Sequence, residues 1–380
     1  MSHKVCWPSQ RSPTGFATDG GFPFQMLVLS ELFDSTRVLV PCASAGVHAG
    51  AIALTGHNLS ICPMAVPAGD GLRRKLSMLI WTARSIRTIS REIRAADAVH
   101  APIPGDVGSI GMLLALVHRK PLFVRHCGNW FEPRTAAEHV WRWFMERAAG
   151  GRNVMLATGG GADPPSSNRS LRWVFSTSLT RTELGAWARE RQWPSGAVKL
   201  LIACRQDKPK GTDIVIDSLP SIRAAFPGAT LDVAGDGPML PRLKALAQER
   251  GVAEHVTFHG RVDHDAVLRL MQAADLFCYP TSASEGFPKV VLEALACGLP
   301  VLTTRVSVLP HLFERGCGIL LDSATPDTLA SAVRLALADP DRYRAMSRAA
   351  VKTASAYSLE AWRDTIGDHL RTAWGPLRAA

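Results

Sequence analysis

Several features that define other classes of protein are missing from this sequence. Its eight cysteines are scattered over positions 6, 42, 62, 127, 204, 278, 297 and 317, without a Cys-x-x-Cys pair or a Cys/His cluster. This spacing predicts neither a zinc site nor a disulfide framework, and it favours a reducing compartment. Low-complexity segments and repeats of solenoid length are also missing, which excludes repeat architectures.

The sequence also has little that would hold it in a membrane. The stretch from Ser9 to Phe24 is polar and rich in Gly and Pro, unlike the apolar core of a signal peptide. The best apolar run, from Gly111 to Val117, is far shorter than the roughly 20 residues that cross a bilayer. We therefore expect a cytoplasmic protein without a transmembrane helix. Its 380 residues suggest two or three domains.

Positive charge is in excess and unevenly distributed. Of the net charge of +10, residues 1–190 carry +8 and the remaining residues +2. Net charge concerns partners and not fold, so the N-terminal half is expected to face something acidic. Anionic lipid, a pyrophosphate-linked carrier and nucleic acid all fit this charge. No nucleic-acid recognition module is visible, and we expect no nucleic-acid partner.

Short apolar runs alternate with helical stretches along most of the chain. Continuous apolar strands between helices indicate parallel sheets covered on both faces, and two such sets predict two doubly wound α/β domains. A turn cluster at 193–196 separates a first domain over 1–190 from a second over 198–355. A final helix is expected over 356–380. The predicted strands are Arg37–Cys42, Ala98–Ala101, Pro121–His126, Asn153–Thr158, Arg172–Ser176, Lys199–Cys204, Thr230–Ala234, His255–His259, Leu276–Tyr279, Pro300–Thr304 and Ile319–Leu321.

The most informative segment of the sequence spans residues 284–300. Pro288 suits the first turn of a helix, and Gly298 suits its end. Glu285 then lies on the loop before this helix, and Glu293 lies more than a turn inside it. A helix N-terminus presents free N–H groups and positive potential to a diphosphate, and carboxylates accept hydrogen bonds from sugar hydroxyls. The alternative is a capped surface helix with two solvated glutamates.

This segment resembles the signature of the family-four retaining glycosyltransferases, with Glu285-x7-Glu293 inside S-E-G-F-P-x4-E-A-x-A-x-G-x-P. The resemblance covers residues 199–321, with a looser pattern before it. It implies a GT-B fold, in which two Rossmann-like domains face a cleft and residues 356–380 cross back to the first domain. Other matches are Arg205 and Lys210 with the diphosphate-binding pair, Gly235-Asp236-Gly237-Pro238 with the G-D-G-P turn, and Val262 with the G-x-V whose backbone meets the base.

The same resemblance implies a role for each matching residue. Glu285 would lie against the donor sugar, and Glu293 would hold the ribose hydroxyls. Arg205 and Lys210 would neutralise the leaving diphosphate, because fixed cations stabilise charge that develops in a transition state. The alternative for these two is ordinary surface charge. The expected nucleotide-sugar site consists of Gly20, Gly21, Gly235, Gly237, Val262, Gly286, Phe287, Pro288 and Glu293.

The N-terminal half offers two further candidates. Gly20 and Gly21 precede a helical stretch, where GT-B enzymes bring a glycine-rich loop to the donor phosphates; paired glycines permit such an approach but also form ordinary turns. His126 ends a predicted strand, as a catalytic histidine does in many relatives. The register puts the usual histidine position nearer Cys127, and adjacent strand residues face opposite ways.

Two Asp-x-Asp patterns invite a metal-dependent interpretation. Asp263 and Asp265 precede a helical stretch, as do Asp339 and Asp341. Aspartate at such a position caps a helix, and we favour capping over metal binding. We therefore expect no metal and no cofactor, since the nucleotide sugar is a substrate.

A basic stripe lies in the first half of the chain. On a helical projection Arg84, Arg87, Arg91 and Arg94 share one face, while Leu79, Ile86, Ile89 and Ile93 cluster on the other. The stripe is either a solvated face or a surface that docks on anionic membrane or a lipid-pyrophosphate acceptor. The uneven charge supports the second interpretation, with the protein peripheral at the inner face of the cell membrane.

The resemblance implies a retaining, metal-independent hexosyltransferase. The donor is expected to be a nucleotide-diphosphate sugar, and the acceptor a sugar or lipid-linked glycan of cell-surface polysaccharide or glycoconjugate synthesis. Two alternatives stay open: a nucleotide-sugar epimerase on the same fold, and a non-catalytic nucleotide-sugar-binding protein.

Overall fold

The computed structural model describes residues 1–43, 51–69, 71–133, 135–284 and 286–378. The chain forms two compact units, Met1–Ser178 with Leu359–Ala380, and Leu179–Ser358. The division falls after Ser178, about a dozen residues before the boundary predicted at 190. The reason is that α5 (Arg181–Trp187) packs against α9 (Lys289–Ala296) and α12 (Pro340–Ser355), so it belongs to the second unit.

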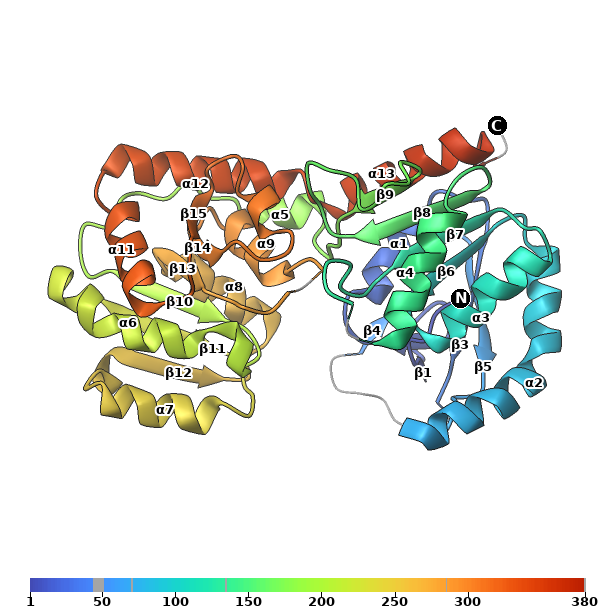
Figure 1. The fold of residues 1–380 in the computed structure, drawn as a ribbon, viewed down its shortest axis with the longest axis horizontal. Coiled ribbons are helices and arrows are strands. Elements are labelled where there is room, and N and C mark those ends of the chain that lie inside the picture. Colours follow the sequence, from blue (N-terminus) through green and yellow to red (C-terminus); the bar gives the residue numbers. More distant parts are fainter. Residues whose placement is uncertain (44–50, 70, 134, 285, 379–380) are drawn as a thin grey trace. The chain divides into compact units, whose positions relative to one another are not determined.

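The second unit is built on one parallel six-stranded sheet, in the order β12-β11-β10-β13-β14-β15 (Figure 1). The chain enters at β10, adds β11 and β12 on one side, and then adds β13, β14 and β15 on the other. The direction of winding therefore changes between β10 and β13, which pair in parallel register at Leu200 and Leu276. The strands are β10 (Lys199–Ala203), β11 (Thr230–Ala234), β12 (Val256–Gly260), β13 (Leu276–Tyr279), β14 (Val301–Thr304) and β15 (Gly318–Leu321).

Helices cover this sheet in two groups. One group packs α6 beside α7 and α11, and the other packs α9 beside α5, α8 and α12. Strand residues such as Leu200, Ile202 and Val233 are fully buried, as expected of a sheet with both faces covered. The remaining elements are η1 (Lys208–Lys210), α6 (Thr212–Ala225), α7 (Leu240–Glu249), η2 (Ala253–His255), α8 (His264–Ala273), α10 (Leu309–Leu312) and α11 (Pro326–Ala336).

Both Asp-x-Asp patterns cap helices in this unit. The Asp263 carboxylate accepts a hydrogen bond from the backbone N–H of Ala266 at 2.7 Å and so caps α8. Asp339 accepts from the backbone N–H groups of Asp341 and Arg342 and so caps α12. The prediction of capping is confirmed, because each first aspartate satisfies helix N–H groups that have no partner inside the helix.

The first unit contains two parallel ladders. One pairs β3 with β5, and the other has the order β6-β7-β8-β9. The N-terminal residues touch both ladders, since the Ser2 N–H donates to the Leu39 carbonyl and the Met1 ammonium donates to the His100 carbonyl. A small antiparallel sheet joins β1, β2 and β4. The strands are β1 (Trp7–Pro8), β2 (Phe16–Thr18), β3 (Thr36–Pro41), β4 (Ile52–Ala53), β5 (Leu59–Met64), β6 (Val99–Ile103), β7 (Leu122–His126), β8 (Asn153–Thr158) and β9 (Leu171–Val174).

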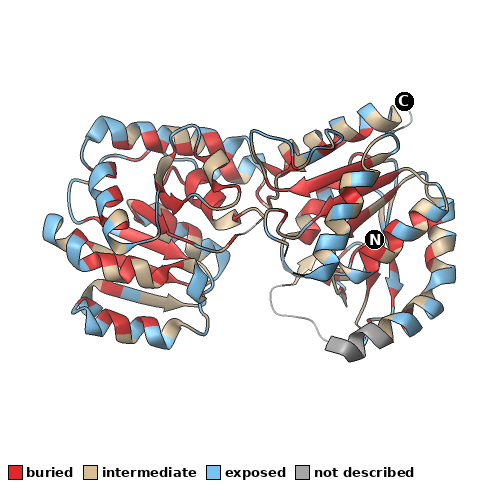
Figure 2. Ribbon diagram, in the orientation of Figure 1, coloured by how far each residue is buried: buried red, intermediate tan, exposed pale blue. Residues whose placement is uncertain are grey.

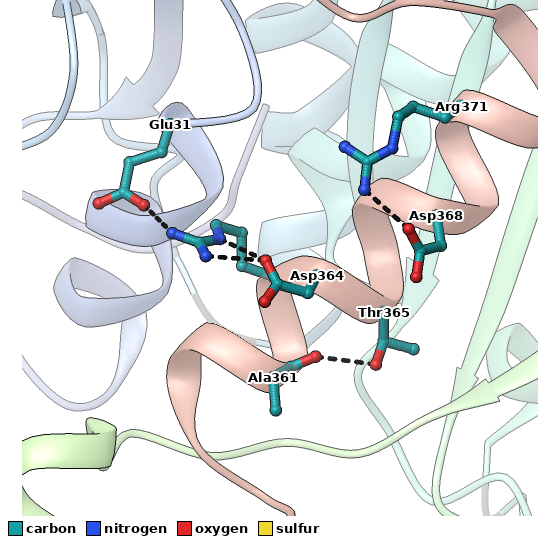
Figure 3. Close-up of polar contacts among 7 residues, drawn as sticks. Glu31, Ala361, Asp364, Thr365, Asp368 and Arg371 are labelled. Atoms are coloured by element: carbon teal, nitrogen blue, oxygen red, sulfur yellow. Dashed lines mark hydrogen bonds and ion pairs between the residues drawn. The ribbon is translucent and has the colours of Figure 1, made fainter.

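Five helices among the described residues complete the first unit, and the last comes from the far end of the chain. They are α1 (Phe22–Ser30), α2 (Gly71–Ala95), α3 (Asp106–Val117), α4 (Ala136–Ala148) and α13 (Leu359–Trp374). Trp362, Ile366 and Leu370 of α13 are fully buried in a core shared with α1 and β3. Arg363 adds ion pairs to Glu31 and to Asp364, the two acidic residues labelled at these contacts in Figure 3. The helix predicted at the C-terminus is therefore part of the first unit.

The long helix α2 is rotated relative to the sequence-based prediction. Trp81, Ile89 and Ile93 are buried, and Trp81 donates from its indole N–H to the Ala65 carbonyl at 2.7 Å. Leu79 and Ile86, which were predicted to pack inward, are 70% and 39% exposed. The prediction was wrong for these two residues, because the buried stripe of α2 runs through Trp81, Ile89 and Ile93 instead. The outer face of α2 is visible in Figure 2.

Candidate functional site

The residues predicted to bind the donor follow the carboxyl ends of four neighbouring strands in the second unit. Arg205 and Lys210 follow β10, and Gly235 and Gly237 follow β11. Val262 follows β12, and the segment from Gly286 to Glu293 follows β13. In a doubly wound sheet, ligands bind in the crevice at the carboxyl edge where the strand order reverses. The strand order thus places these loops along one edge of the sheet, on both sides of the reversal between β10 and β13.

The loop after β10 carries the two predicted cations. The Arg205 side chain is 72% exposed and lies 3.3 Å from the Asp207 carboxylate. The Lys210 ammonium lies 3.2 Å from the Tyr279 hydroxyl, and its partial burial lowers the pKa of Lys210. Gly211 has a φ of 79°, and a Cβ there would lie 2.4 Å from the Pro280 carbonyl oxygen. Glycine at this position lets the loop after β10 approach the loop after β13.

The glycine turn after β11 approaches its neighbour equally closely. A Cβ on Gly235 would lie 1.9 Å from the Cys204 carbonyl oxygen, and one on Gly237 would lie 2.5 Å from the Gln206 carbonyl oxygen. Gly235 also has a φ of 114°, in the region that favours glycine. Both glycines therefore allow the turn to pack backbone against backbone.

Sequence reasoning missed Gln206, which holds these loops together. Its buried amide donates to the carbonyls of Cys204 at 2.9 Å and Ala234 at 3.0 Å. Its side-chain oxygen accepts a hydrogen bond from the Thr212 hydroxyl at 2.7 Å. A single side chain thus joins the ends of two strands to the start of α6. Its place between Arg205 and Lys210 is the only signal of it in the sequence.

The helix predicted after β13 is α9, and Glu293 lies inside it. Pro288 is buried at the N-cap, and Phe287 packs its ring against that of Tyr357, 5.5 Å away. Gly298 follows the helix with a φ of 65°. Glu293 is 9% exposed, and Glu285 lies outside the described residues. Capping and termination of this helix follow the sequence pattern.

Glu293 has a partner that the sequence pattern did not indicate. The His264 ring nitrogen Nε2 lies 3.1 Å from Glu293 Oε1. His264 is the first residue of α8, two positions after Val262. The Glu293 carboxylate raises the pKa of His264 above its ordinary value.

In the first unit, the glycine loop precedes α1. Gly20 has a φ of 71°, and Gly21 is the N-cap of the helix. Lys4, which sequence reasoning also missed, pairs with Asp19 beside this loop at 2.6 Å. The positive φ explains a glycine at position 20, and the lysine places a cation at the loop.

His126 ends β7 and is almost wholly buried, at 1% exposure. Neither ring nitrogen has a hydrogen-bond partner within the described ranges, and the ring packs edge-on against Trp130. Burial lowers the pKa of His126 to about 4, despite the opposing influence of Glu138. The next residue, Cys127, is exposed, as expected from strand alternation. His126 is therefore a neutral imidazole held away from solvent.

A cavity of about 540 Å³ also lies in the first unit. Its walls include Thr36 and Val38 of β3, Val99 of β6 and Pro121 just before β7. These residues stand at or near the amino ends of parallel strands, whereas Gly20 and His126 are not among its lining residues. The cavity is thus separate from the predicted sugar site.

No group of three or more His, Cys, Asp or Glu side chains within the described part of the chain is arranged to hold a metal ion. The predicted site instead combines cations, glycine turns and one buried carboxylate. Such a set suits a phosphorylated ligand with hydroxyl groups.

Comparison with known proteins shows which family and relatives part of this chain resembles. Residues 186–353 match the family described as glycosyl transferases group 1. A D-inositol 3-phosphate glycosyltransferase of Segniliparus rotundus is 35% identical over 226 residues, which cover 57% of this chain and 49% of the relative. A GDP-mannose-dependent alpha-(1-6)-phosphatidylinositol monomannoside mannosyltransferase of Mycobacterium tuberculosis is 37% identical over 169 residues, 42% of this chain and 43% of the relative. The chain thus spans about half the length of these curated relatives, or less.

Two solved structures share the fold over nearly the whole chain. Anabaena Alr3699/HepE in complex with UDP matches with a TM-score of 0.70 and 17% identity, covering 97% of this chain and 100% of that one. WaaG, a glycosyltransferase involved in lipopolysaccharide biosynthesis, matches with a TM-score of 0.60 and 18% identity, covering 92% and 95%. Both likenesses support the fold predicted from the sequence.

Proposed function

We propose that the chain is a glycosyl transferase of group 1, the family that residues 186–353 match, and that it transfers a hexosyl group from a nucleotide-diphosphate sugar to a sugar or lipid-linked glycan. The observation that carries the proposal is that Arg205 and Lys210 follow the carboxyl end of β10 and Glu293 follows that of its neighbour β13, at the edge where doubly wound sheets bind ligands. Because the named relatives are transferases, transfer is favoured over epimerisation and over binding without turnover.

Each part of the crevice suits one part of such a donor. Arg205 and Lys210 supply fixed positive charge for a leaving diphosphate, which lowers the barrier without a metal ion. The turn at Gly235 and Gly237 packs its backbone directly against the loop that carries Arg205 and Lys210, because a Cβ at either glycine would collide with that loop. Glu293 offers a carboxylate to vicinal hydroxyls of the ribose. From the likeness to the family, we also propose that the reaction retains the configuration of the transferred sugar and needs no metal ion.

The acceptor is proposed to approach the first unit, which carries the excess positive charge. On α2 the four arginines at 84, 87, 91 and 94 are exposed, as predicted. Leu79 and Ile80 of the same helix are 70% and 57% exposed. Exposed cationic and apolar side chains on one helix suit the headgroup region of an anionic bilayer.

This face supports a lipid-linked acceptor of cell-surface glycoconjugate synthesis, reached by peripheral contact at the inner face of the cell membrane. Within the described residues, no helix is both long enough and apolar enough to span a bilayer. The relatives act on phosphatidylinositol mannosides or inositol phosphate by their names, which agrees with an acceptor that bears phosphate.

Product analysis by mass spectrometry tests the proposed reaction. The protein is first screened against UDP- and GDP-sugars by thermal shift, because a ligand of the native state raises the melting temperature. Donors that bind are then incubated with lipid-linked and soluble glycan acceptors. The expected product is the acceptor enlarged by one hexose, with release of nucleoside diphosphate. An isomerised nucleotide sugar, or binding without any product, would overturn the proposal.

A further inference from the structure

The contact between His264 and Glu293 joins two helices of the second unit at the predicted donor site. His264 opens α8, which follows β12, and Glu293 lies in the second turn of α9, which follows β13. The Nε2 to Oε1 distance of 3.1 Å makes this a hydrogen bond. The contact therefore links two loops at the carboxyl edge of the sheet.

Local structure fixes both ends of this contact. The Asp263 carboxylate caps α8 through the Ala266 N–H, which sets the direction in which the next residue leaves the helix. On the other side, α9 packs against α8, and Glu293 is one of its buried residues. The His264 imidazole thus belongs to the first residue of α8, while the Glu293 carboxylate belongs to the interior of α9.

The charges around the pair explain why it is stable. A carboxylate that is nine-tenths buried costs free energy unless it is paired, and His264 supplies the partner. The other charged groups that face the imidazole are Asp265 of its own helix and Glu183 of α5. All of these are acidic, so together with Glu293 they raise the pKa of His264. The charged form of the histidine is favoured beside Glu293.

The pair leaves one carboxylate oxygen for a ligand. Within the part of the chain that the structure describes, the hydrogen bond of the Glu293 side chain is made by Oε1, and Oε2 accepts none. We propose that His264 is a positioning residue for the donor: it holds Oε1 of Glu293 so that Oε2 is presented to the ribose hydroxyls of the nucleotide. This inference rests on the proposed function and names a residue through which donor affinity is set.

Equilibrium binding of nucleoside diphosphates tests the role directly. UDP and GDP are titrated calorimetrically into the wild type, His264→Ala and His264→Gln, each also with the 2′,3′-dideoxy form of the nucleotide. We expect His264→Ala to weaken binding of the ribose form about five- to tenfold, the effect of losing one charge-assisted hydrogen bond. Binding of the dideoxy form should be unchanged, because it has no hydroxyls for Glu293 to hold. His264→Gln should restore part of the loss.

Kinetics and a matched control complete the design. His264→Ala should raise KM for the donor and leave kcat within about twofold, since the residue does not touch the reacting atoms. In the wild type, donor affinity should fall as the pH rises through the titration of His264, and this fall should vanish in His264→Gln. The control is His311→Ala. It removes another His–Glu contact of 3.1 Å, with the exposed Glu314, and should leave nucleotide binding and kinetics unchanged.

The outcomes separate this inference from the proposed function. Equal weakening of ribose and dideoxy nucleotides, or no weakening at all, would overturn the positioning role while leaving transfer intact. A fall in kcat at constant KM would do the same. A wild type that binds neither nucleotide and consumes no nucleotide sugar would overturn the proposed function itself. If thermal unfolding shows that His264→Ala is unstable, the wild type is compared with His264→Gln instead.

Discussion

The side-chain amide of Gln206 donates to the Ala234 carbonyl at 3.0 Å, so that a buried residue of one loop ties down the end of the neighbouring strand β11. The same side chain reaches Thr212 at the start of α6. Arg205 and Lys210 flank this anchor in sequence. Their placement therefore depends on a residue that touches no part of the proposed donor.

Replacing Gln206 by Ala should destabilise the second unit by about 2 kcal/mol or more, because buried carbonyls lose their donor. Urea unfolding measures the change, with Gln248→Ala as the control, since Gln248 is exposed on α7. Donor binding should weaken as well. Unfolding curves that coincide for Gln206→Ala and the wild type would show that the loops hold together without this anchor.

Removing either cation should impair turnover. We expect Arg205→Ala and Lys210→Ala each to lower kcat on the order of 10²-fold, because a fixed charge opposite the leaving diphosphate is lost. Steady-state kinetics with the true donor gives the measurement, and Lys208→Ala, an exposed lysine of the same loop, is the control. Near-normal turnover in both variants would remove these residues from the proposed mechanism.

Removal of divalent metal ions by a chelator should leave the rate of the reaction unchanged. If Arg205 and Lys210 neutralise the diphosphate, no divalent cation is needed, and activity after dialysis against EDTA should match that of the untreated enzyme. The initial rate is compared before and after dialysis, and again after addition of magnesium or manganese. Loss of activity that either metal restores would contradict metal independence and would favour Asp263 and Asp265 as metal ligands.

The outer face of α2 should bind anionic vesicles and not neutral ones. Each arginine near a negatively charged bilayer contributes about 1 kcal/mol, and salt screens this within a Debye length. Changing Arg84, Arg87, Arg91 and Arg94 to Gln should therefore reduce the amount of protein that co-sediments with anionic vesicles, which is measured at low and at high salt.

A matched variant separates this face from charge in general. Changing four exposed arginines of the second unit, Arg242, Arg269, Arg334 and Arg348, to Gln removes the same charge and should leave vesicle binding intact. Replacing Leu79 and Ile80 by Ser should weaken binding at high salt as well. Equal binding to neutral vesicles would argue for a soluble acceptor instead.

Burial of His126 should make the first unit sensitive to mild acid. Its pKa is lowered to about 4 in the folded state from an ordinary 6.5, so the unfolded chain binds more protons between these values. The free energy of unfolding should therefore fall by about 3 kcal/mol as the pH drops from 6.5 to 4. In His126→Phe this component should disappear from the pH dependence of urea unfolding. An unchanged pH profile would mean that the ring is hydrated or paired in solution.

Sequence patterns predicted the strands best where both faces are covered. Thr230–Ala234 and Leu276–Tyr279 were predicted end to end, because each is a short run whose ends are marked by turn residues. The strand Leu59–Met64 was missed, since it contains Ser60 and Pro63 and its burial is irregular. Proline interrupts strand patterns, yet it is tolerated here because β5 pairs on one side alone.

The partners of site residues depend on tertiary packing that spacing does not encode. The helix around Glu293 could be predicted from Pro288 and Gly298, but its contact with His264 arises from the packing of α8 against α9. The buried stripe of α2 likewise includes Trp81, whose indole N–H donates to the Ala65 carbonyl outside the helix. Local pattern determined the elements, and long-range contacts determined which polar groups meet.

The return of α13 to the first unit has a consequence for the order of folding during synthesis. A ribosome releases the chain from its N-terminus, and domains generally fold as units while the chain emerges. The second unit, Leu179–Ser358, has its whole sequence available before α13 appears. The first unit, although made earlier, must wait for Trp362, Ile366 and Leu370 to cover the core around α1 and β3. The unit that is translated first is thus the one that finishes folding last.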